Sequence, residues 1–199
     1  MKKFDRLPLQ ERKDEIQMAA LELFNEKGFA ATTMENIIQK VSLSKGGVYR
    51  IYPSTSAILS DLMIKGMHLR NMYYEERVKK ELEEGRELSL DFFVEMIVDS
   101  LLLYPEISSV YAEFLWEKRR REELEVLYKK ICNETVKETA ALIRQCGAER
   151  FFFADDQTLV RLTELMNASV LSMHTLNMTD FFMKNKKQLC KAILDILKI

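Results

Sequence analysis

The stretch that decides the fold is GFAATTMENIIQKVSLSKGGVYRIYPSTSAIL, residues 28–59. Its apolar spacing predicts two short helices with a break of about three residues between them. Thr32 and Glu35 form a capping-box pattern before the first helix, and Ser44 stands at the N-cap position of the second. Helices shorter than about 12 residues are marginal alone in water. We therefore expect both to pack on a longer helix, residues 10–27, where apolar residues recur at helical spacing.

Two adjacent glycines, Gly46 and Gly47, open the second short helix, although a glycine inside a helix costs about 1 kcal/mol relative to alanine. A helix start presents free N–H groups and a positive dipole, which suit a phosphate. Without side chains, the backbone there can approach DNA closely. The layout is that of a helix-turn-helix, with the second short helix as the reader of the major groove. Lys45, Tyr49 and Arg50 are then the expected DNA contacts.

The end of this segment is open to two interpretations. Tyr52 and the helix start at Ser54 and Thr55 could meet the flanking phosphate. Alternatively, the glycines only form a tight turn, and Tyr49 and Tyr52 are aromatic residues of the core. The sequence does not choose between them.

Composition favours an all-α protein. Of 199 residues, 31% are charged and 47% apolar, which is ordinary for a soluble globular protein, and only three prolines and six glycines interrupt the helix formers. The net charge of −1 argues against a protein that coats nucleic acid without specificity. Residues 1–65 nevertheless carry ten Lys or Arg against eight Asp or Glu, a mildly basic front on an acidic remainder.

Other functional classes find little support. There is no apolar run of membrane-span length and no signal peptide, so we expect a cytoplasmic protein without membrane contact. The three cysteines, Cys132, Cys146 and Cys190, are expected to be reduced. His68 and His174 lack the companions of a metal site, and no nucleophile or phosphate-loop motif is present. We expect no enzyme activity, no cofactor and no metal.

The rest of the chain predicts a helical domain. We expect a DNA-binding domain over residues 1–55 and an effector-binding and dimerisation domain over residues 56–199. Its expected helices cover residues 55–83, 90–103, 107–118, 121–146, 157–176 and 181–198, with CGAERFFFADD as a turn and Asp155 or Asp156 as a cap.

Residues 12–62 closely resemble the DNA-binding domain of TetR-family transcriptional regulators. The resemblance is carried by a Gly-aromatic pair, Thr-Thr, a short helix, Ser-Lys-Gly, a tyrosine and an aromatic-Pro-Ser, spread over about 30 positions. It implies a two-fold DNA operator as partner. The DNA-binding residues expected from the pattern and the resemblance together are Thr33, Ser44, Lys45, Gly46, Gly47, Tyr49, Arg50, Tyr52, Ser54 and Thr55.

Three positions depart from the family pattern. Ile38 and Val41 stand where alanine is usual, which predicts slightly wider helix packing. Ser42 replaces the usual turn glycine, so either serine adopts that backbone conformation or the turn differs. Thr55 and Ser56 replace a Lys-Glu pair and remove one expected phosphate contact, which lowers the salt slope of DNA binding by about 1.

The resemblance also implies a cavity for a small-molecule effector among the later helices. Its expected lining is Met96, Tyr104, Tyr111, Phe114, Trp116 and Tyr128, for a hydrophobic or cationic-aromatic effector. A packed helical core explains the same residues. The last two predicted helices are apolar over wide arcs, which predicts a homodimer interface that includes Leu162, Met166, Met173, Leu189, Ile193 and Ile196. A monomer with a fully buried helical hairpin is the alternative.

The resulting hypothesis is a homodimeric transcriptional regulator, a repressor that a small-molecule effector releases from a palindromic operator. Two other classes stay open. One is a TetR-like interaction protein that no longer binds an operator, and the other is a helical-bundle enzyme or small-molecule carrier.

Overall fold

The computed structural model describes residues 8–145 and 156–197, and every regular element in these ranges is a helix. The expected all-α fold is therefore confirmed. The chain divides into two compact units, the first ending at Met63 and the second beginning at Ile64. None of the helices in the described ranges combines the length and apolar character that a membrane crossing needs.

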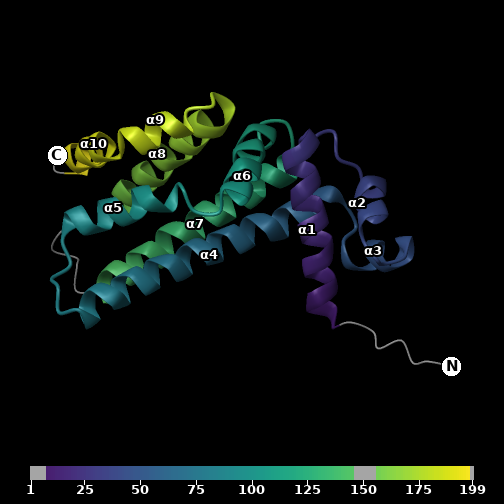
Figure 1. Cartoon of the computed structure of the whole chain (residues 1–199), viewed down its shortest axis with the longest axis horizontal. Coiled ribbons are helices and arrows are strands. Elements are labelled where there is room, and N and C mark those ends of the chain that lie inside the picture. The colour runs from purple at the N-terminus through teal and green to yellow at the C-terminus, as the bar shows by residue number, and fades with distance from the viewer. Residues whose placement is uncertain (1–7, 146–155, 198–199) are drawn as a thin grey trace. The chain divides into compact units, whose positions relative to one another are not determined.

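The first unit consists of α1 (Leu9–Lys27), α2 (Met34–Lys40), α3 (Lys45–Ile51) and the start of α4 (Thr55–Glu83) (Figure 1). The predicted packing of the first short helix is confirmed, because α2 packs on α1, and α1 to α4 all contribute buried side chains to this unit. Phe24 and Phe29 meet edge to face, with ring centroids 5.3 Å apart. The core side chains that are at most 2% exposed are Ile16, Ala20, Phe24, Phe29, Ile37, Val48, Ile58, Leu59 and Leu62.

The cap of α2 differs from the prediction. Thr33, not Thr32, is the N-cap, and its hydroxyl accepts a hydrogen bond from the backbone N–H of Asn36 at 3.3 Å. The Thr33 N–H in turn donates to the side-chain oxygen of Asn36 at 3.0 Å, which completes the reciprocal box. Thr32 is buried, and its hydroxyl donates to the Gly28 carbonyl oxygen at 2.8 Å. The S/T-x-x-E/Q pattern favoured Thr32 and Glu35, but asparagine fulfils the same role one residue later.

The turn between α2 and α3 uses serine in place of glycine without left-handed backbone. Among the described residues only Tyr104 and Asn177 are non-glycines at positive φ, so Ser42 lies in ordinary backbone space. The Glu15 carboxylate of α1 accepts bonds from both the N–H and the hydroxyl of Ser42, at 2.5 and 3.1 Å. The turn therefore differs from a glycine turn and is held by a side chain from another helix.

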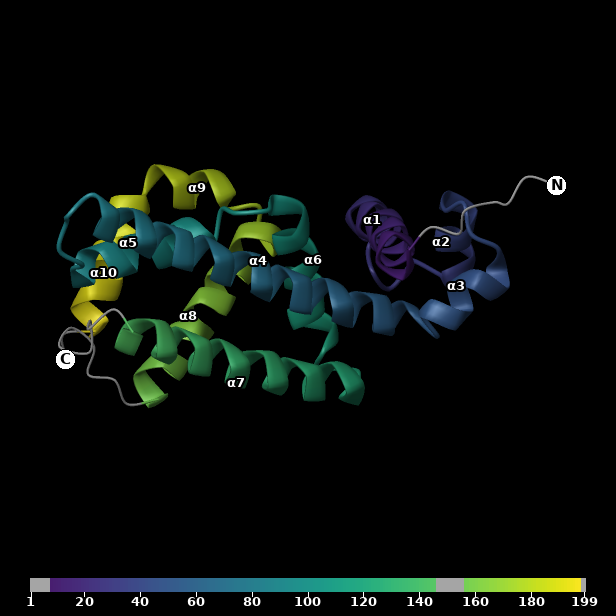
Figure 2. The same ribbon diagram turned by 90° about the horizontal axis from the view of Figure 1, so that it is seen from below.

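The second unit contains the remainder of α4 and six further helices in the described ranges. They are α5 (Leu90–Ser100), α6 (Pro105–Glu117), α7 (Glu122–Gln145), α8 (Asp156–Thr175), α9 (Thr179–Lys184) and α10 (Lys186–Leu197). Helix α8 packs on both α6 and α7, and α10 packs on α5 (Figure 2). Gly66 lets α4 approach α6 closely, because an added Cβ would lie 2.9 Å from Cγ2 of Ile107.

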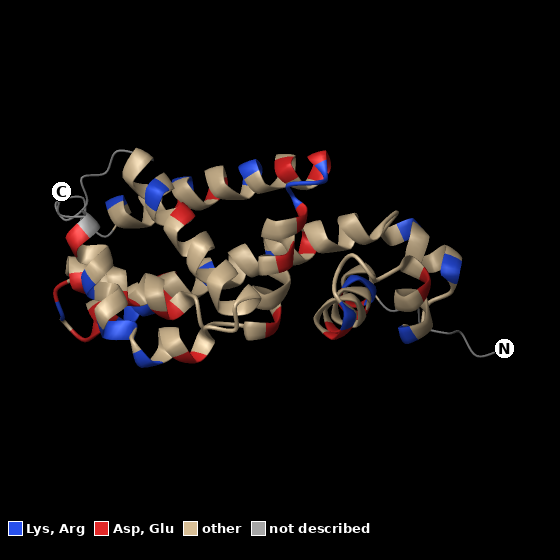
Figure 3. Cartoon of the chain, turned by 90° about the horizontal axis from the view of Figure 1, so that it is seen from above, with Lys and Arg blue, Asp and Glu red and all other residues tan. Residues whose placement is uncertain are grey.

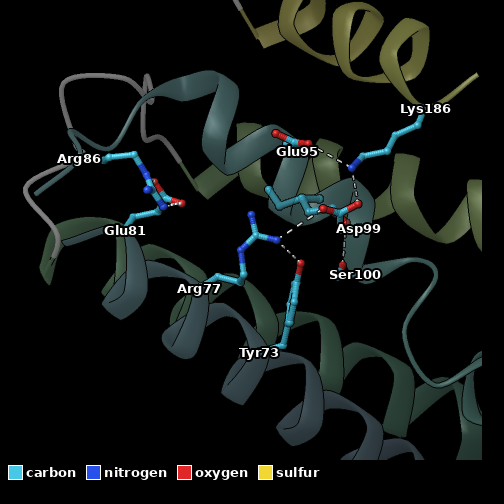
Figure 4. Close-up of polar contacts among 9 residues, drawn as sticks. Tyr73, Arg77, Glu81, Arg86, Glu95, Asp99, Ser100 and Lys186 are labelled. Carbon is cyan, nitrogen blue, oxygen red and sulfur yellow. Dashed lines mark hydrogen bonds and ion pairs between the residues drawn. The ribbon is translucent and has the colours of Figure 1, made fainter. Parts of the chain in front are cut away.

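Charged side chains tie α10 to its neighbours (Figure 4). The Lys186 ammonium lies 2.6 Å from a carboxylate oxygen of Asp99 and 3.1 Å from one of Glu95, both on α5. Asp99 also faces the Arg77 guanidinium of α4 at 3.6 Å, and Arg77 donates to the Tyr73 hydroxyl at 2.9 Å. This chain of contacts joins α4, α5 and α10.

Helix ends in the second unit differ from the prediction at two places. Pro105 opens α6, two residues before the predicted start at residue 107, since its fixed φ suits the first helical turn. The predicted helix over 181–198 is two helices, because the Asn185 amide donates to the Phe181 carbonyl oxygen at 2.8 Å and ends α9 there. The predicted turn CGAERFFFADD, including Cys146, and a cap at Asp155 lie mostly or wholly outside the described residues. Asp156 is the first residue of α8.

Candidate nucleic-acid interface

The predicted recognition helix α3 presents Gly46 on the surface. Ser44 caps the helix as expected, and its hydroxyl accepts from the Gly47 N–H at 3.3 Å. A Cβ placed on Gly46 would meet no atom of the chain within 4 Å, and its φ is not positive. Neither packing nor backbone geometry within the protein requires glycine at this position. Gly46 therefore lowers the stability of α3 without improving any contact within the chain.

Gly47 differs from its neighbour. A Cβ there would lie 3.3 Å from the Ser44 hydroxyl oxygen and 3.6 Å from two carbons of Leu43. That spacing is tight, so this glycine serves the helix start itself. The expectation that both glycines clear the backbone for DNA therefore separates into an internal role for Gly47 and an open surface at Gly46.

Lys45 reaches outward, but it already has a partner. Its ammonium lies 2.6 Å from a carboxylate oxygen of Glu35 in the first turn of α2, and both side chains are more than half exposed. The hydrogen bond between them raises the pKa of Lys45 and lowers the pKa of Glu35. Figure 3 shows acidic as well as basic residues on this unit. Glu35 would compete with a phosphate for Lys45.

Tyr49 and Arg50 are both exposed on α3, as predicted for contacts to another molecule. Tyr49 is 39% exposed, and the Lys45 ammonium lies 5.9 Å from its ring centroid. Arg50 forms no ion pair with any residue in the part of the chain that the structure describes. The interpretation of Tyr49 as a core aromatic is therefore wrong.

Tyr52 occupies the core, which corrects the expectation that it meets a phosphate. It is 3% exposed, its hydroxyl donates to Asp61 at 2.7 Å, and the buried Gln17 amide donates to that hydroxyl at 2.8 Å. Burial is the largest cause of the raised pKa of Tyr52. Its polar end is already satisfied within the first unit, where it joins α1 to α4, and Lys13 adds an ion pair to Asp61 at 3.2 Å.

The remaining predicted contacts lie at helix starts. Thr33 is exposed, and its hydroxyl is engaged with Asn36. Ser54 caps α4, accepting from the Ala57 N–H at 3.2 Å, and Thr55 is the first residue of that helix. Both are half-buried. The hydroxyls of Thr33 and Ser54 cap helix starts, and of the three residues only Thr33 is exposed.

Sequence reasoning missed two polar residues near the predicted interface. Asn36 pairs with Thr33 and also accepts from the Lys27 ammonium at 2.5 Å. Glu35 was assigned a capping role and is instead the partner of Lys45. The spacing of α2 could have shown the first, because Thr33-x-x-Asn36 is a capping pair with asparagine at its last position.

The predicted effector-pocket residues fall into three groups. Tyr111, Phe114 and Tyr128 lie together, with ring centroids 5.8 and 6.4 Å apart along the series. Met96 is buried in a different cluster of the second unit. Tyr104 and Trp116 are 44% and 48% exposed, so they do not line an interior.

A polar network crosses the aromatic group. The Tyr111 hydroxyl donates to Asn167 at 3.0 Å, the Asn167 amide donates to the Tyr128 hydroxyl at 3.0 Å, and Tyr128 donates to Glu164 at 2.6 Å. Burial is the largest cause of the raised pKa of both tyrosines. The network joins α6, α7 and α8 through neutral phenols.

The residues predicted for a dimer interface face the chain's own core. Leu162, Met173 and Ile193 are at most 7% exposed, and Met166 and Leu189 pack partly buried against the same clusters. The side chain of Ile196 lies outside the described residues. The wide apolar arcs of the sequence are used inside one chain, since α8 contacts α6, α7 and α9. The exposed large apolar side chains of α8 and of residues 176–183 are instead Val160, Leu176, Phe181 and Met183.

Comparison with known proteins places the first unit. Residues 16–62 match the family model of bacterial regulatory proteins of the tetR family. Over 56 residues, 28% of this chain, the sequence is 36% identical to the HTH-type transcriptional regulator YfiR of Bacillus subtilis (strain 168). Over 51 residues, 26% of the chain, it is 39% identical to the HTH-type regulator YerO of the same organism. The matched segments span 27% and 18% of those relatives.

Solved structures share the fold along almost the whole chain. Salmonella enterica GusR superposes with a TM-score of 0.76 at 17% identity, over 99% of this chain and all of that one. The fatty acid degradation regulator FadR from Bacillus halodurans gives 0.69 at 15% identity, over 98% and 97% of the two chains. A tetR-family regulatory protein from Rhodococcus RHA1 gives 0.57 at 18% identity, over 83% and 84%. Residues 16–62 are thus similar to the tetR family of bacterial regulatory proteins, and the chain as a whole shares the fold of these solved regulators.

Proposed function

We propose that this chain is a DNA-binding transcriptional repressor that holds a palindromic operator as a homodimer and releases it when a small-molecule effector binds. Operator binding is assigned to residues 1–55, and effector binding and dimerisation to residues 56–199. The observation that carries the proposal is Gly46, a costly helix glycine in open space, on a helix within the family match.

The face of α3 supports contact with DNA. A glycine that nothing inside the protein requires is explained when another molecule lies against its backbone. Arg50 is exposed and has no acidic partner among the described residues, so its guanidinium is available for a base edge or a phosphate. Tyr49 adds an aromatic side chain with a polar tip. Phosphate contacts would fix the register, and base contacts would give the sequence preference.

A homodimer follows from the need to read two half-sites. Two recognition helices about 34 Å apart span successive major grooves, and two-fold dimers are the commonest oligomers. The corrected interface is the exposed apolar set of Val160, Leu176, Phe181 and Met183, each 46–66% exposed in one chain. Sedimentation of the purified chain tests this, and a single copy at micromolar concentration would contradict it.

The aromatic group of the second unit supports effector binding. Tyr111, Phe114 and Tyr128 offer apolar area with a few polar tips, the usual mixture in a small-molecule site. An effector can release the operator only if it binds one conformer better than the other. A coupling of about 3 kcal/mol would weaken operator binding roughly 150-fold.

The experiment selects binding sequences from a random pool of duplex DNA and measures affinity by fluorescence anisotropy at two salt concentrations. We expect a two-fold sequence, with affinity that falls steeply as salt rises. Arg50→Ala should lose about 10- to 100-fold, as for a base contact worth about 1–3 kcal/mol. Arg161→Ala is the matched control, because this exposed arginine lies on α8, and it should bind like the native protein.

Two outcomes would overturn the proposal. No retention of any DNA at low salt would favour a TetR-like interaction protein, or a helical-bundle enzyme or carrier. Equal affinity of the Arg50 variant and the native chain would show that α3 is not the reading helix.

A further inference from the structure

Arg70 of α4 is a partly buried cation without an acidic partner in the described part of the chain. It makes one hydrogen bond, from Nη2 to the Thr135 hydroxyl of α7 at 2.9 Å. Its Nε is fully enclosed and has no hydrogen-bond partner. Buried charges in proteins are ordinarily paired, because an isolated one costs several kcal/mol. Arg70 therefore requires an explanation.

Other partly buried charges of the second unit are satisfied. Arg77, about two turns further along α4, faces Asp99 at 3.6 Å and donates to Tyr73. Lys118 pairs with Glu125 at 3.2 Å, and Glu164 accepts from Tyr128. Figure 4 shows the pairing around Arg77. Arg77 and Lys118 thus have acidic partners, whereas Arg70 has none among the described residues.

The surroundings of Arg70 form a site of mixed character. Its guanidinium carbon lies 5.9 Å from the ring centroid of Tyr74, which holds the group over an aromatic face. Its positive charge lowers the pKa values of Tyr111 and Cys132, against the burial that raises both. The charge of Arg70 thus acts on Tyr111, a member of the aromatic group proposed for the effector, while Thr135 and Tyr74 are its direct contacts.

We propose that Arg70 binds the carboxylate of an organic-acid effector, with Nε and Nη2 as the two donors and Thr135 beside them. The assignment rests on the proposed effector-binding role of the second unit. It changes the expected chemistry of the effector from apolar or cationic to anionic.

The guanidinium geometry favours this class of ligand. The fork of an arginine matches the two oxygens of a carboxylate with parallel hydrogen bonds, and Nε is an enclosed donor that has no partner of its own. A single guanidinium balances one negative charge, whereas a doubly charged phosphate would leave a net negative charge in a partly buried place. Nη2 of Arg70 now donates to the Thr135 hydroxyl, and a bound carboxylate would accept hydrogen bonds from both Nη2 and that hydroxyl.

Thermal unfolding of the full chain, without DNA, tests the site with known probes. Sodium acetate and sodium benzoate are compared with acetamide and benzamide, with sodium chloride keeping the ionic strength constant. At about five times Kd, each carboxylate should raise the Tm of the native protein by about 2–4 °C, and the matched amides should not.

Variants assign the effect to this residue. Arg70→Met should abolish the carboxylate shift. Arg70→Lys keeps the charge and the stem, so it folds with the least disturbance, but it loses the fork and should retain less than half of the shift. Arg161→Met, on the exposed face of α8, is the control and should keep the full shift.

The proposal is overturned if the native chain does not distinguish carboxylates from amides, or if both Arg70 variants respond as the native chain does. Because no DNA is present, the result is independent of operator binding. A chain that binds no operator but shows an Arg70-dependent shift would lose the proposed repressor function and keep the carboxylate site.

Discussion

The two units of this protein differ in how their sequences resemble those of known proteins. The first unit contains residues 16–62, the segment that matches the tetR-family model. Along nearly the whole chain, the fold persists in solved structures at 15–17% identity. The family-model match is thus confined to the first unit, whereas the likeness of fold extends along nearly the whole chain.

The contrast separates two kinds of constraint. On α3, neither Gly46 nor Arg50 has an internal partner among the described residues, which the proposed contact with DNA would explain. In the second unit, Leu162 and Met173 are defined by packing, and other apolar residues of similar volume would serve. Substitutions can test whether this division holds.

The largest expected effect is at Gly46. Gly46→Leu should lower operator affinity about 100-fold, or about 2.7 kcal/mol, because a side chain would hold the backbone away from DNA. Stability should not fall, since the space around Gly46 is empty. Gly46→Ala should stabilise α3 by up to about 1 kcal/mol while still weakening binding. Anisotropy and urea unfolding measure the two quantities, and unchanged affinity in Gly46→Leu would remove the external constraint on this residue.

Tyr52 and Tyr49 should differ in the opposite sense, since removing the Tyr52 hydroxyl should lower stability and removing the Tyr49 hydroxyl should lower DNA affinity. Tyr52→Phe leaves Gln17 and Asp61 without their shared hydroxyl and should cost about 1–3 kcal/mol of unfolding free energy. Operator affinity of the folded protein should change less than about twofold. Tyr49→Phe is the matched variant, and it should leave stability within about 0.5 kcal/mol while weakening DNA binding. Equal destabilisation by both would show that Tyr49 also serves the core.

Removing the charge of Glu35 should have a smaller effect and should strengthen operator binding instead of weakening it. Glu35→Gln removes a negative charge 2.6 Å from Lys45 and frees that ammonium for a phosphate. Operator affinity should rise about 3- to 10-fold, and the salt slope should steepen by about 1. Glu134→Gln, which removes an exposed carboxylate on α7, is the control. Weaker binding after Glu35→Gln would mean that Glu35 contacts a base or supports Lys45.

The smallest effect concerns His174 in the second unit. Burial lowers its pKa below 6.5, and its Nε2 lies 2.9 Å from the Ser108 hydroxyl. The unfolded chain then binds the proton more tightly, so stability is complete above about pH 7 and declines as the pH falls through 6.5 toward the folded pKa. Urea unfolding between pH 5 and 8 should show this decline. His174→Gln should flatten it, and His68→Gln on α4 should not.

Much of the fold could be predicted because local signals coincided. The bounds of α3 and α4 follow from Ser44 and Ser54 at their starts, and the structure gives the predicted residues at both helices. The core contacts of Phe24, Ile37 and Val48 follow from helical spacing alone. These predictions needed only neighbours in the sequence.

The errors share a different cause. Tyr52 was assigned to DNA because nothing local reveals that Gln17 and Asp61 converge on its hydroxyl. Leu162 and Ile193 were assigned to a second copy because a wide apolar arc does not say whether the surface covering it belongs to the same chain. The sequence does not single out Arg70, because only the structure shows that no acidic side chain among the described residues pairs with it.

The two hydrogen bonds that the Glu15 carboxylate accepts from Ser42 have a consequence for engineering new DNA specificities. Swapping residues 32–55 between family members is the natural way to exchange recognition helices, yet in this protein the anchor of the turn sits on α1, outside the exchanged piece. If a segment with a glycine turn replaced residues 32–55, the Glu15 carboxylate would lose its hydrogen bonds to Ser42. If residues 32–55 were moved into another protein, Ser42 would lose its bonds to Glu15. The transferable module therefore starts at or before Glu15.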